Sequence, residues 1–163
     1  MTITEISETS WDAILRIQEE AYTGIPPEEV EVLKRKWHNS PESCFIFQAE
    51  NEMILAYLLA HSWNSLAPPK LFEPVPTDSA GKILYLHDLA VSKDARGLGL
   101  GKQLANKLID SAKNKQYEKV LLVAVQGSGK FWASLGFKQI LDVPVCASYG
   151  ADAKLMSLTL KRT

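Results

Sequence analysis

The segment Leu89-Ala90-Val91-Ser92-Lys93-Asp94-Ala95-Arg96-Gly97-Leu98-Gly99-Leu100-Gly101-Lys102 passes from an apolar run through a polar turn to three alternate glycines. An amphipathic helix is predicted to begin at about Leu100. The first N–H groups of a helix have no partner inside it, and the helix dipole places partial positive charge on them. Glycine lets a ligand approach the main chain, while Arg96 and Lys102 add formal positive charge. The segment therefore predicts an anion site suited to a diphosphate.

Spacing separates the glycine-rich phosphate motifs that compete for this turn. A Walker P-loop needs a glycine where Arg96 stands and a serine or threonine at Gln103, so that motif is excluded. The dinucleotide fingerprint needs its third glycine where Lys102 or Leu104 stands. The pattern that remains is R-x-x-G-x-G, ending at Gly101. The structural alternative is a turn that glycine softens only so that a strand and a helix can pack.

The composition is that of an ordinary globular protein. The chain has 163 residues, 46% hydrophobic and 23% charged, which suits one domain, residues 1–163, with its own core. A net charge of -1 does not indicate binding to nucleic acid or to an anionic membrane surface. The N-terminus has no signal-peptide pattern and the apolar run 53–60 is too short to span a bilayer, so a cytoplasmic protein is expected. The two cysteines match no metal spacing, so free thiols and no metal are expected.

Hydrophobic periodicity predicts an α/β (α+β) fold, with a mixed sheet and helices on both faces. The expected order is β-α-α-β-β-β-α-β-α-β-β. Ser7 or Ser10 caps the first predicted helix, which glycine and proline at 24–27 end. The proline-rich segment 64–81 is expected to be a long functional loop. The other predicted elements are strands at 3–6, 44–49, 53–63, 82–91, 119–125, 137–141 and 154–160, and helices at 28–38, 100–114 and 128–135.

Two signatures in order give the chain a resemblance to the GCN5-related N-acetyltransferase (GNAT) superfamily. The turn from Arg96 to Gly101 resembles the family's Q/R-x-x-G-x-G/A motif, which follows the fourth strand. Phe131-Trp132-Ala133-Ser134-Leu135-Gly136-Phe137 resembles the second signature, an aromatic pair followed by three residues and Gly-Phe. The N-terminal half matches only in pattern. The resemblance implies a mostly antiparallel sheet of about seven strands that splays between strands four and five.

The resemblance also implies acetyl-CoA as co-substrate. Main-chain groups of Leu89 and Val91 would pair with the pantetheine arm as if it were an added strand, and an N–H near Leu89 would polarise the thioester oxygen. The amides from Gly97 to Lys102 would hold the diphosphate. The residues implied to bind acetyl-CoA are Leu89, Ala90, Val91, Arg96, Gly97, Leu98, Gly99, Leu100, Gly101, Lys102, Ser128, Phe131 and Trp132.

The strand before the turn carries the candidate bases. Residues 85–91 are similar to the corresponding strand of arylalkylamine N-acetyltransferases and, with Glu in place of His87, of polyamine acetyltransferases. A lysine-like ammonium has a pKa of about 10.4, so acetyl transfer needs a base beside the amine. His87 is the first candidate, with a half-buried structural histidine as the alternative. Asp88 is the rival base, or else a hydrogen-bonded residue that fixes a local bulge. Strict alternation would place Tyr85, His87 and Leu89 on one face and Asp88 on the other.

The general acid is left unassigned by the sequence. Many GNAT enzymes have a tyrosine where Trp132 stands, and an indole cannot protonate the leaving thiolate. A thiol with a pKa of about 8.5 is a tolerable leaving group without an acid. Tyr149, Ser128 or a water can otherwise take this role. Trp63 and the proline-rich loop are expected to wall the acceptor pocket.

Three functions stay open at this point. The first is an N-acetyltransferase that moves acetyl from acetyl-CoA to a small primary amine by direct attack in a ternary complex. The second is a coenzyme A-binding sensor without turnover. The third keeps the chemistry but acetylates a protein or peptide. GNAT relatives are often dimers, so a homodimer is expected by analogy.

Overall fold

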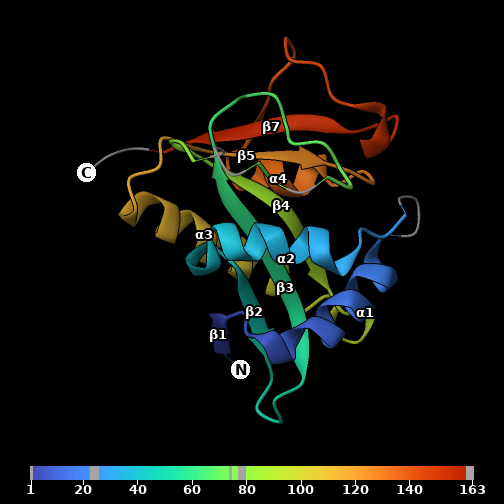
Figure 1. Ribbon diagram of the computed structural model, residues 1–163. Coiled ribbons are helices and arrows are strands. Elements are labelled where there is room, and N and C mark those ends of the chain that lie inside the picture. The colour runs from blue at the N-terminus through green and yellow to red at the C-terminus, as the bar shows by residue number, and fades with distance from the viewer. Residues whose placement is uncertain (1, 23–25, 74, 77–79, 161–163) are drawn as a thin grey trace.

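The computed structural model describes residues 2–22, 26–73, 75–76 and 80–160. Within these residues seven strands form one sheet in the order β1-β2-β3-β4-β5-β7-β6 (Figure 1). The strands are β1 (Thr2–Glu5), β2 (Phe45–Gln48), β3 (Ile54–Trp63), β4 (Ile83–Val91), β5 (Lys119–Ala124), β6 (Lys138–Gln139) and β7 (Lys154–Thr159). The α-helices are α1 (Trp11–Ala21), α2 (Val30–Asn39), α3 (Leu100–Asn114) and α4 (Gly129–Ser134). The predicted order of strands and helices is confirmed.

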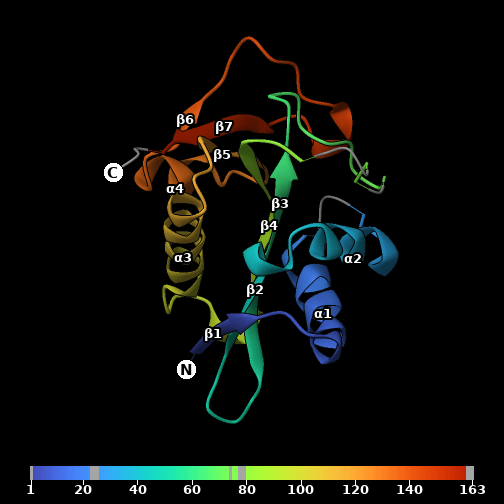
Figure 2. The ribbon, with the colours of Figure 1, turned by 60° about the vertical axis from the view of Figure 1, so that its left-hand side comes forward.

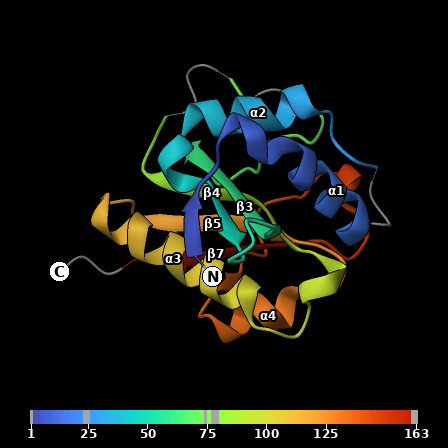
Figure 3. The same ribbon diagram turned by 90° about the horizontal axis from the view of Figure 1, so that it is seen from below.

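Helices cover both faces of the sheet. Seen from below, α1 and α2 lie on one face and α3 with α4 on the other (Figure 3). On α3 the buried side chains follow helical spacing, with Leu100, Leu104, Leu108 and Ala112 facing the sheet. Each fully buried leucine contributes roughly 1.5 to 3 kcal/mol to the free energy of folding. The predicted α3 begins and ends at the observed residues, because this apolar stripe and the glycines before it both mark the helix.

The sheet is antiparallel except for the pair β4 and β5. These two strands are in register only from Ile83 opposite Lys119 to Leu86 opposite Leu122. Beyond Leu86, β4 runs on to Val91 beside β3 and away from β5. Figure 2 shows β3 and β4 descending from the layer that holds β5 and β7. The predicted splay between the fourth and fifth strands is therefore confirmed.

A bulge in β4 changes which side chains share a face. Leu59 lies opposite Asp88 and Ala60 lies opposite Leu86, so His87 is an extra residue with no partner on β3. The extra residue shifts the alternation, and Asp88 joins His87 on the face covered by α1 and α2. Leu89 instead packs into the core under α3. The expectation that His87 and Leu89 share a face opposite Asp88 was wrong for this reason.

Most predicted element ends lie within one residue of the observed ends, and α2 and β6 show the largest differences. Residues 28 and 29 precede α2, because Glu29 has an extended backbone and Glu28 turns its side chain inward. Helix α4 has six residues, and β6 has only two. The segment 64–81 contains no helix or strand among its described residues, as expected. In the described part of the chain, no helix is both long and apolar enough to cross a membrane.

Candidate functional site

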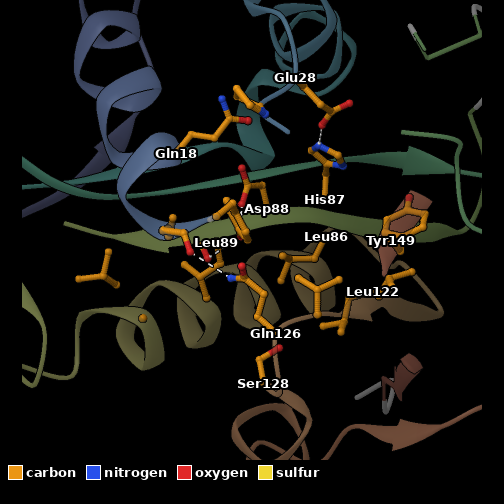
Figure 4. Close-up of a pocket in the computed structure, with 18 of the residues that line it drawn as sticks. Gln18, Glu28, Leu86, His87, Asp88, Leu89, Leu122, Gln126, Ser128 and Tyr149 are labelled. Carbon is orange, nitrogen blue, oxygen red and sulfur yellow. Dashed lines mark hydrogen bonds and ion pairs between the residues drawn. The ribbon is translucent and has the colours of Figure 1, made fainter. Parts of the chain in front are cut away.

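A pocket of about 550 Å³ lies where β4 and β5 separate. Strands β4 and β5 supply its middle, the ends of α1 and of the segment before α2 supply one wall, and α3 and α4 supply another. Leu71 and Tyr149 enter from two loops that are far apart in the sequence. Figure 4 shows His87 and Asp88 on one side of β4, with Leu122, Gln126 and Ser128 on the opposite side of the pocket. One cavity thus passes through the split in the sheet.

The glycine turn leaves its main chain open. Gly97 and Gly99 have φ angles of 86° and 76°, in the left-handed region where glycine carries no steric penalty. A Cβ added to either would meet no atom of the described chain within 4 Å. Gly99 is also the N-cap of α3, so the first amides of that helix lie directly after the open turn. This geometry suits the close approach of an anion to the main chain.

The predicted binding residues divide into three groups: four at the rim, one in the core and eight that line the pocket. The turn itself lies at the rim, where Gly97, Leu98, Gly99 and Lys102 are exposed and do not line the pocket. The side chain of Leu100 is buried in the core, so only its main chain can meet a ligand. The predicted residues that line the pocket are Leu89, Ala90, Val91, Arg96, Gly101, Ser128, Phe131 and Trp132.

Trp132 packs within an aromatic cluster at the pocket wall. Its ring centroid lies 4.8 Å from that of Phe131 and 5.5 Å from that of Phe137, both edge to face. The side chain is buried. Ser128 is the N-cap of α4 and its hydroxyl caps no amide of that helix. The second sequence signature therefore builds a wall of the pocket, and its indole supplies packing.

Two side chains tie the rim of the pocket to the end of α1. The Nη2 of Arg96 donates to the carbonyl oxygen of Glu20 at 3.3 Å, which holds the guanidinium beside the glycine turn. The Nε2 of Gln126 donates to the carbonyl of Ala21 at 3.0 Å. Gln126 has a φ of 52°, unusual for a residue other than glycine. Such a conformation persists only where its surroundings hold it, as they do here where β5 ends.

His87 and Glu28 form a buried pair. The Nε2 of His87 lies 2.5 Å from Oε1 of Glu28, and the two side chains are only 4% and 7% exposed. The amide of Phe72 donates to Oε2 at 2.8 Å, and Nζ of Lys36 lies 3.8 Å from the same oxygen. Burial acts to raise the pKa of Glu28, but His87, Lys36 and the Phe72 amide together lower it to about 2. Glu28 is therefore a carboxylate held from several sides.

Lys36 is buried on the sheet-facing side of α2. Its side chain is 1% exposed, and its Nζ has no hydrogen-bond partner among the described residues. Burial lowers the pKa of this amine, and the carboxylates of Glu28 and Asp88 act in the opposite direction. A buried ammonium is stable only beside opposite charge, so Lys36 and Glu28 depend on each other.

Asp88 joins the bulge of β4 to two tyrosines. Tyr22, just after α1, donates to Oδ1, and Tyr57 of β3 donates to Oδ2 at 2.5 Å. Tyr22 also lies 3.2 Å from the carbonyl of Leu89. Burial raises the pKa of Asp88, although His87 and the two tyrosines act to lower it. Both carboxylate oxygens are occupied, which matches the alternative that Asp88 fixes the bulge.

Tyr149 lies in the pocket wall with its hydroxyl already engaged. The hydroxyl donates to the carbonyl of Pro69 at 2.5 Å and lies 3.2 Å from the hydroxyl of Tyr85. Burial raises the pKa of Tyr149 to about 12. The phenol therefore keeps its proton at neutral pH, as a general acid must. It also ties Tyr149 to Pro69, two residues before Leu71 of the pocket wall.

Comparison with known protein families identifies the family of this chain. The sequence model of the acetyltransferase (GNAT) family matches residues 11–137, which include both signatures. The chain belongs to the GNAT family. Comparison of this GNAT protein with curated protein sequences gave no significant match.

Solved structures share the fold of this GNAT protein over nearly its whole length. Ard1 from Thermoplasma volcanium has a TM-score of 0.75 at 16% identity, covering 99% of this chain and 98% of that one. The Escherichia coli ribosomal-protein-S18-alanine N-acetyltransferase has a TM-score of 0.69 at 20% identity, covering 99% and 95%. The GNAT-like decarboxylase GphF, solved with isobutyryl-CoA, has a TM-score of 0.78 at 14% identity, covering 99% and 100%. At these identities the similarity establishes the fold alone.

Sequence reasoning missed several residues of the GNAT protein's pocket. Glu28 was assigned to a helix, and nothing local indicates its contact with His87. Lys36 contacts Glu28 without lining the pocket, and it had a readable signal, because it follows Leu33 by three residues on the buried stripe of α2. Trp63, at the end of β3, was expected in the acceptor wall but does not line the pocket, since its indole N–H donates to Ala67 in the following loop at 2.9 Å. Leu71 lines the wall instead.

The two cysteines lie apart from this chemistry. Cys44 is buried and burial raises its pKa to about 12, while Cys146 is exposed. Neither cysteine lines the pocket. Among the residues that the structure describes, no three His, Cys, Asp or Glu side chains gather to hold a metal ion.

Proposed function

We propose that this GNAT protein transfers an acetyl group from acetyl-CoA to the primary amine of a small molecule, by direct attack in a ternary complex. One observation carries the proposal. The pocket runs from the rim at Arg96 and Gly101, through the split between β4 and β5, to His87. A long donor with a charged end and an acyl end fits a passage built in this way.

The chain offers the donor three kinds of contact. Beyond Leu86, β4 pairs with no residue of β5 in the described chain. The main chain of β4 on that side is therefore available to the pantetheine arm. The amides at the start of α3 and the guanidinium of Arg96 suit the diphosphate. An N–H near Leu89 suits the thioester oxygen, where negative charge develops.

His87 supplies the base in this proposal. It takes a proton from the acceptor ammonium, directly or through water, which leaves a neutral amine to attack the thioester carbon. The C–N bond forms as the C–S bond breaks, and the second proton ends on the sulfur of the free thiol. Tyr149 lines the same pocket and its phenol is protonated, so it is the candidate that gives its own proton to the sulfur and regains the second amine proton. The products are an acetamide and free coenzyme A.

Two hydrogen bonds that hold residues 69–72 beside the pocket favour a small acceptor. The Tyr149 hydroxyl holds Pro69, and the Glu28 carboxylate holds the amide of Phe72. Leu71, between these two anchors, forms part of the pocket wall. Residues 69–72 therefore narrow the acceptor end of a pocket whose whole volume is about 550 Å³.

Release of free thiol from acetyl-CoA tests the proposal. The acceptor panel contains arylalkylamines, polyamines and aminoglycosides, with peptides bearing free N-termini or lysines as a separate arm, and mass spectrometry confirms each acetylated product. Turnover on small amines supports the proposal. Turnover on peptides alone makes the protein a peptide acetyltransferase. Coenzyme A binding without turnover on any acceptor makes it a sensor and overturns the proposed reaction.

Reversing the charge at Arg96 is expected to weaken coenzyme A binding. We expect Arg96→Glu to raise the dissociation constant by roughly 10- to 100-fold, because a charge-assisted hydrogen bond to phosphate is replaced by repulsion. Calorimetry at several salt concentrations measures the change, which should shrink as salt rises. Lys107→Glu is the matched control, since Lys107 is exposed on the outer side of α3. Equal affinity in the two variants would remove Arg96 from the diphosphate site.

A further inference from the structure

We infer that Glu28 is a positioning residue, whose carboxylate holds His87 through Nε2 and so leaves Nδ1 as the nitrogen that takes the proton from the acceptor amine. This inference rests on the proposed function, and it adds a second residue and a specific atom to that function. The partners come from distant parts of the chain, Glu28 from the segment before α2 and His87 from the bulge of β4 (Figure 4).

The carboxylate is itself fixed in place. Oε2 of Glu28 accepts from the amide of Phe72 at 2.8 Å and lies 3.8 Å from the ammonium of Lys36. These contacts leave Oε1 directed at Nε2 of His87, at 2.5 Å. Both side chains are almost fully buried, so neither has room to change rotamer freely. The imidazole ring is thus held at the bulge by a rigid partner.

The charge of that partner selects one tautomer. An ionised carboxylate only accepts hydrogen bonds, so Nε2 of His87 must carry the hydrogen. In the neutral ring Nδ1 then holds the lone pair. Nδ1 is buried and has no hydrogen-bond partner among the described residues, although His87 lines the pocket. A buried acceptor without a partner requires an explanation, and a base awaiting its substrate proton supplies one.

Glu28 is poorly suited to be the base itself. Its oxygens are occupied by His87, Phe72 and Lys36, and its pKa is lowered to about 2. Its negative charge instead stabilises the imidazolium that forms when Nδ1 takes the proton. That proton leaves to solvent after transfer, and the second amine proton goes to the thiolate, so the step balances. The titratable groups that interact with His87 are Glu28, His61, Tyr85 and Asp88. Those groups in turn contact Lys36, Tyr22, Tyr57 and Tyr149.

The decisive comparison is between Glu28→Gln and Glu29→Gln. The first removes the charge with almost no change in shape, and the second removes the charge of the adjacent exposed carboxylate, which caps no amide of α2. We expect Glu28→Gln to lower kcat by roughly 10- to 100-fold, with the dissociation constant for coenzyme A within about twofold of wild type. The acidic limb of its rate profile should move to lower pH, since the imidazolium loses its carboxylate. Glu29→Gln should match wild type in kcat, in the dissociation constant for coenzyme A and in the pH profile of the rate.

Nitrogen NMR of the imidazole rings gives a readout that needs no turnover. The chain has three histidines, so the His87 signals can be assigned with the His87→Gln variant. In wild type and Glu29→Gln, neutral His87 should carry hydrogen on Nε2 and a lone pair on Nδ1. In Glu28→Ala both tautomers should be populated. Thermal unfolding shows which variants are folded, and the near-isosteric Glu28→Gln keeps the question answerable if the alanine variant is not.

Failure of this inference is distinguishable from failure of the proposed function. If wild type acetylates no amine, the reaction is wrong, and the NMR experiment still decides the tautomer. If wild type is active but Glu28→Gln keeps its kcat and pH profile, Glu28 does not position the base. A hydrogen on Nδ1 of neutral His87 in wild type would overturn the inference directly.

Discussion

Replacing His87 by glutamine is expected to lower kcat for acetyl transfer by roughly 100- to 10,000-fold, the range that a positioned general base contributes. Glutamine keeps hydrogen-bonding groups near Glu28 but cannot take up a proton. His87 is the pocket residue whose free nitrogen has no partner among the described residues, whereas both oxygens of Asp88 are occupied by tyrosines. The loss should therefore appear in kcat, measured by thiol release at saturating acetyl-CoA.

The matched control for this experiment is His38→Gln. His38 is exposed on α2 and stacks on Trp37, with ring centroids 4.8 Å apart, and it does not line the pocket. That variant should keep wild-type kcat, and both variants should keep wild-type affinity for coenzyme A. A kcat for His87→Gln within tenfold of wild type would leave the reaction without its base, and Asp88 would return as the candidate.

Acid is expected to destabilise this protein through His61. His61 is fully buried on β3, with its Nδ1 2.9 Å from the carbonyl oxygen of Ser62, and its Nε2 has no partner among the described residues. Burial, with smaller contributions from the charges of His87 and Lys36, lowers the pKa of His61 to about 3. An unfolded histidine titrates near pH 6.5, so below that pH the unfolded chain binds a proton that the folded chain refuses.

The sign and size of the effect follow from this difference. The contribution of neutral His61 to the free energy of unfolding is fully present above pH 6.5. This contribution is lost as the pH falls toward 3, at up to about 1.4 kcal/mol per pH unit. Urea unfolding from pH 7 to pH 4.5 should therefore show wild type losing about 2 to 3 kcal/mol relative to a variant without the imidazole. Glu28, whose pKa is lowered to about 2, adds a loss of the same sign only below about pH 4.5. The raised pKa of Asp88 acts in the opposite direction.

Two replacements separate titration from packing. His61→Gln keeps polarity and His61→Phe keeps the ring, so their stabilities at pH 7 will differ from each other. Both lack a titrating group, and the difference of each from wild type should shrink in parallel as the pH falls. A constant difference between pH 7 and pH 4.5 would mean that His61 is protonated as easily in the folded protein as in the unfolded chain.

Features that depend on a few neighbouring residues were predicted well. Helix α3 was placed at its observed ends because its apolar stripe and the glycines before it are local signals. The open turn before it was predicted for the same reason, since positive φ angles follow from Gly97 and Gly99 themselves, and diphosphate binding at this turn stays a prediction. The long loop followed from its prolines, and the buried parallel strand followed from its apolar run.

Features that depend on contacts between distant segments were not predicted. A bulge is set by pairing with the next strand, so the face of Asp88 could not be deduced from alternation along β4. Glu28 meets His87 only because the segment before α2 crosses the bulge. The prediction that Trp63 lines the pocket was wrong for a similar reason. Its indole N–H donates to Ala67, which turns the ring toward the loop after β3.

Local pattern alone was enough to predict an α/β chain with a glycine turn suited to an anion and a histidine on the strand directly before that turn. The folded chain added which nitrogen of that histidine is free, what holds the other, and why the neighbouring aspartate is occupied. The physical reason is that amide exposure and helix stripes are properties of adjacent residues. Charge pairing, burial and strand register arise only when residues far apart in the chain are brought together.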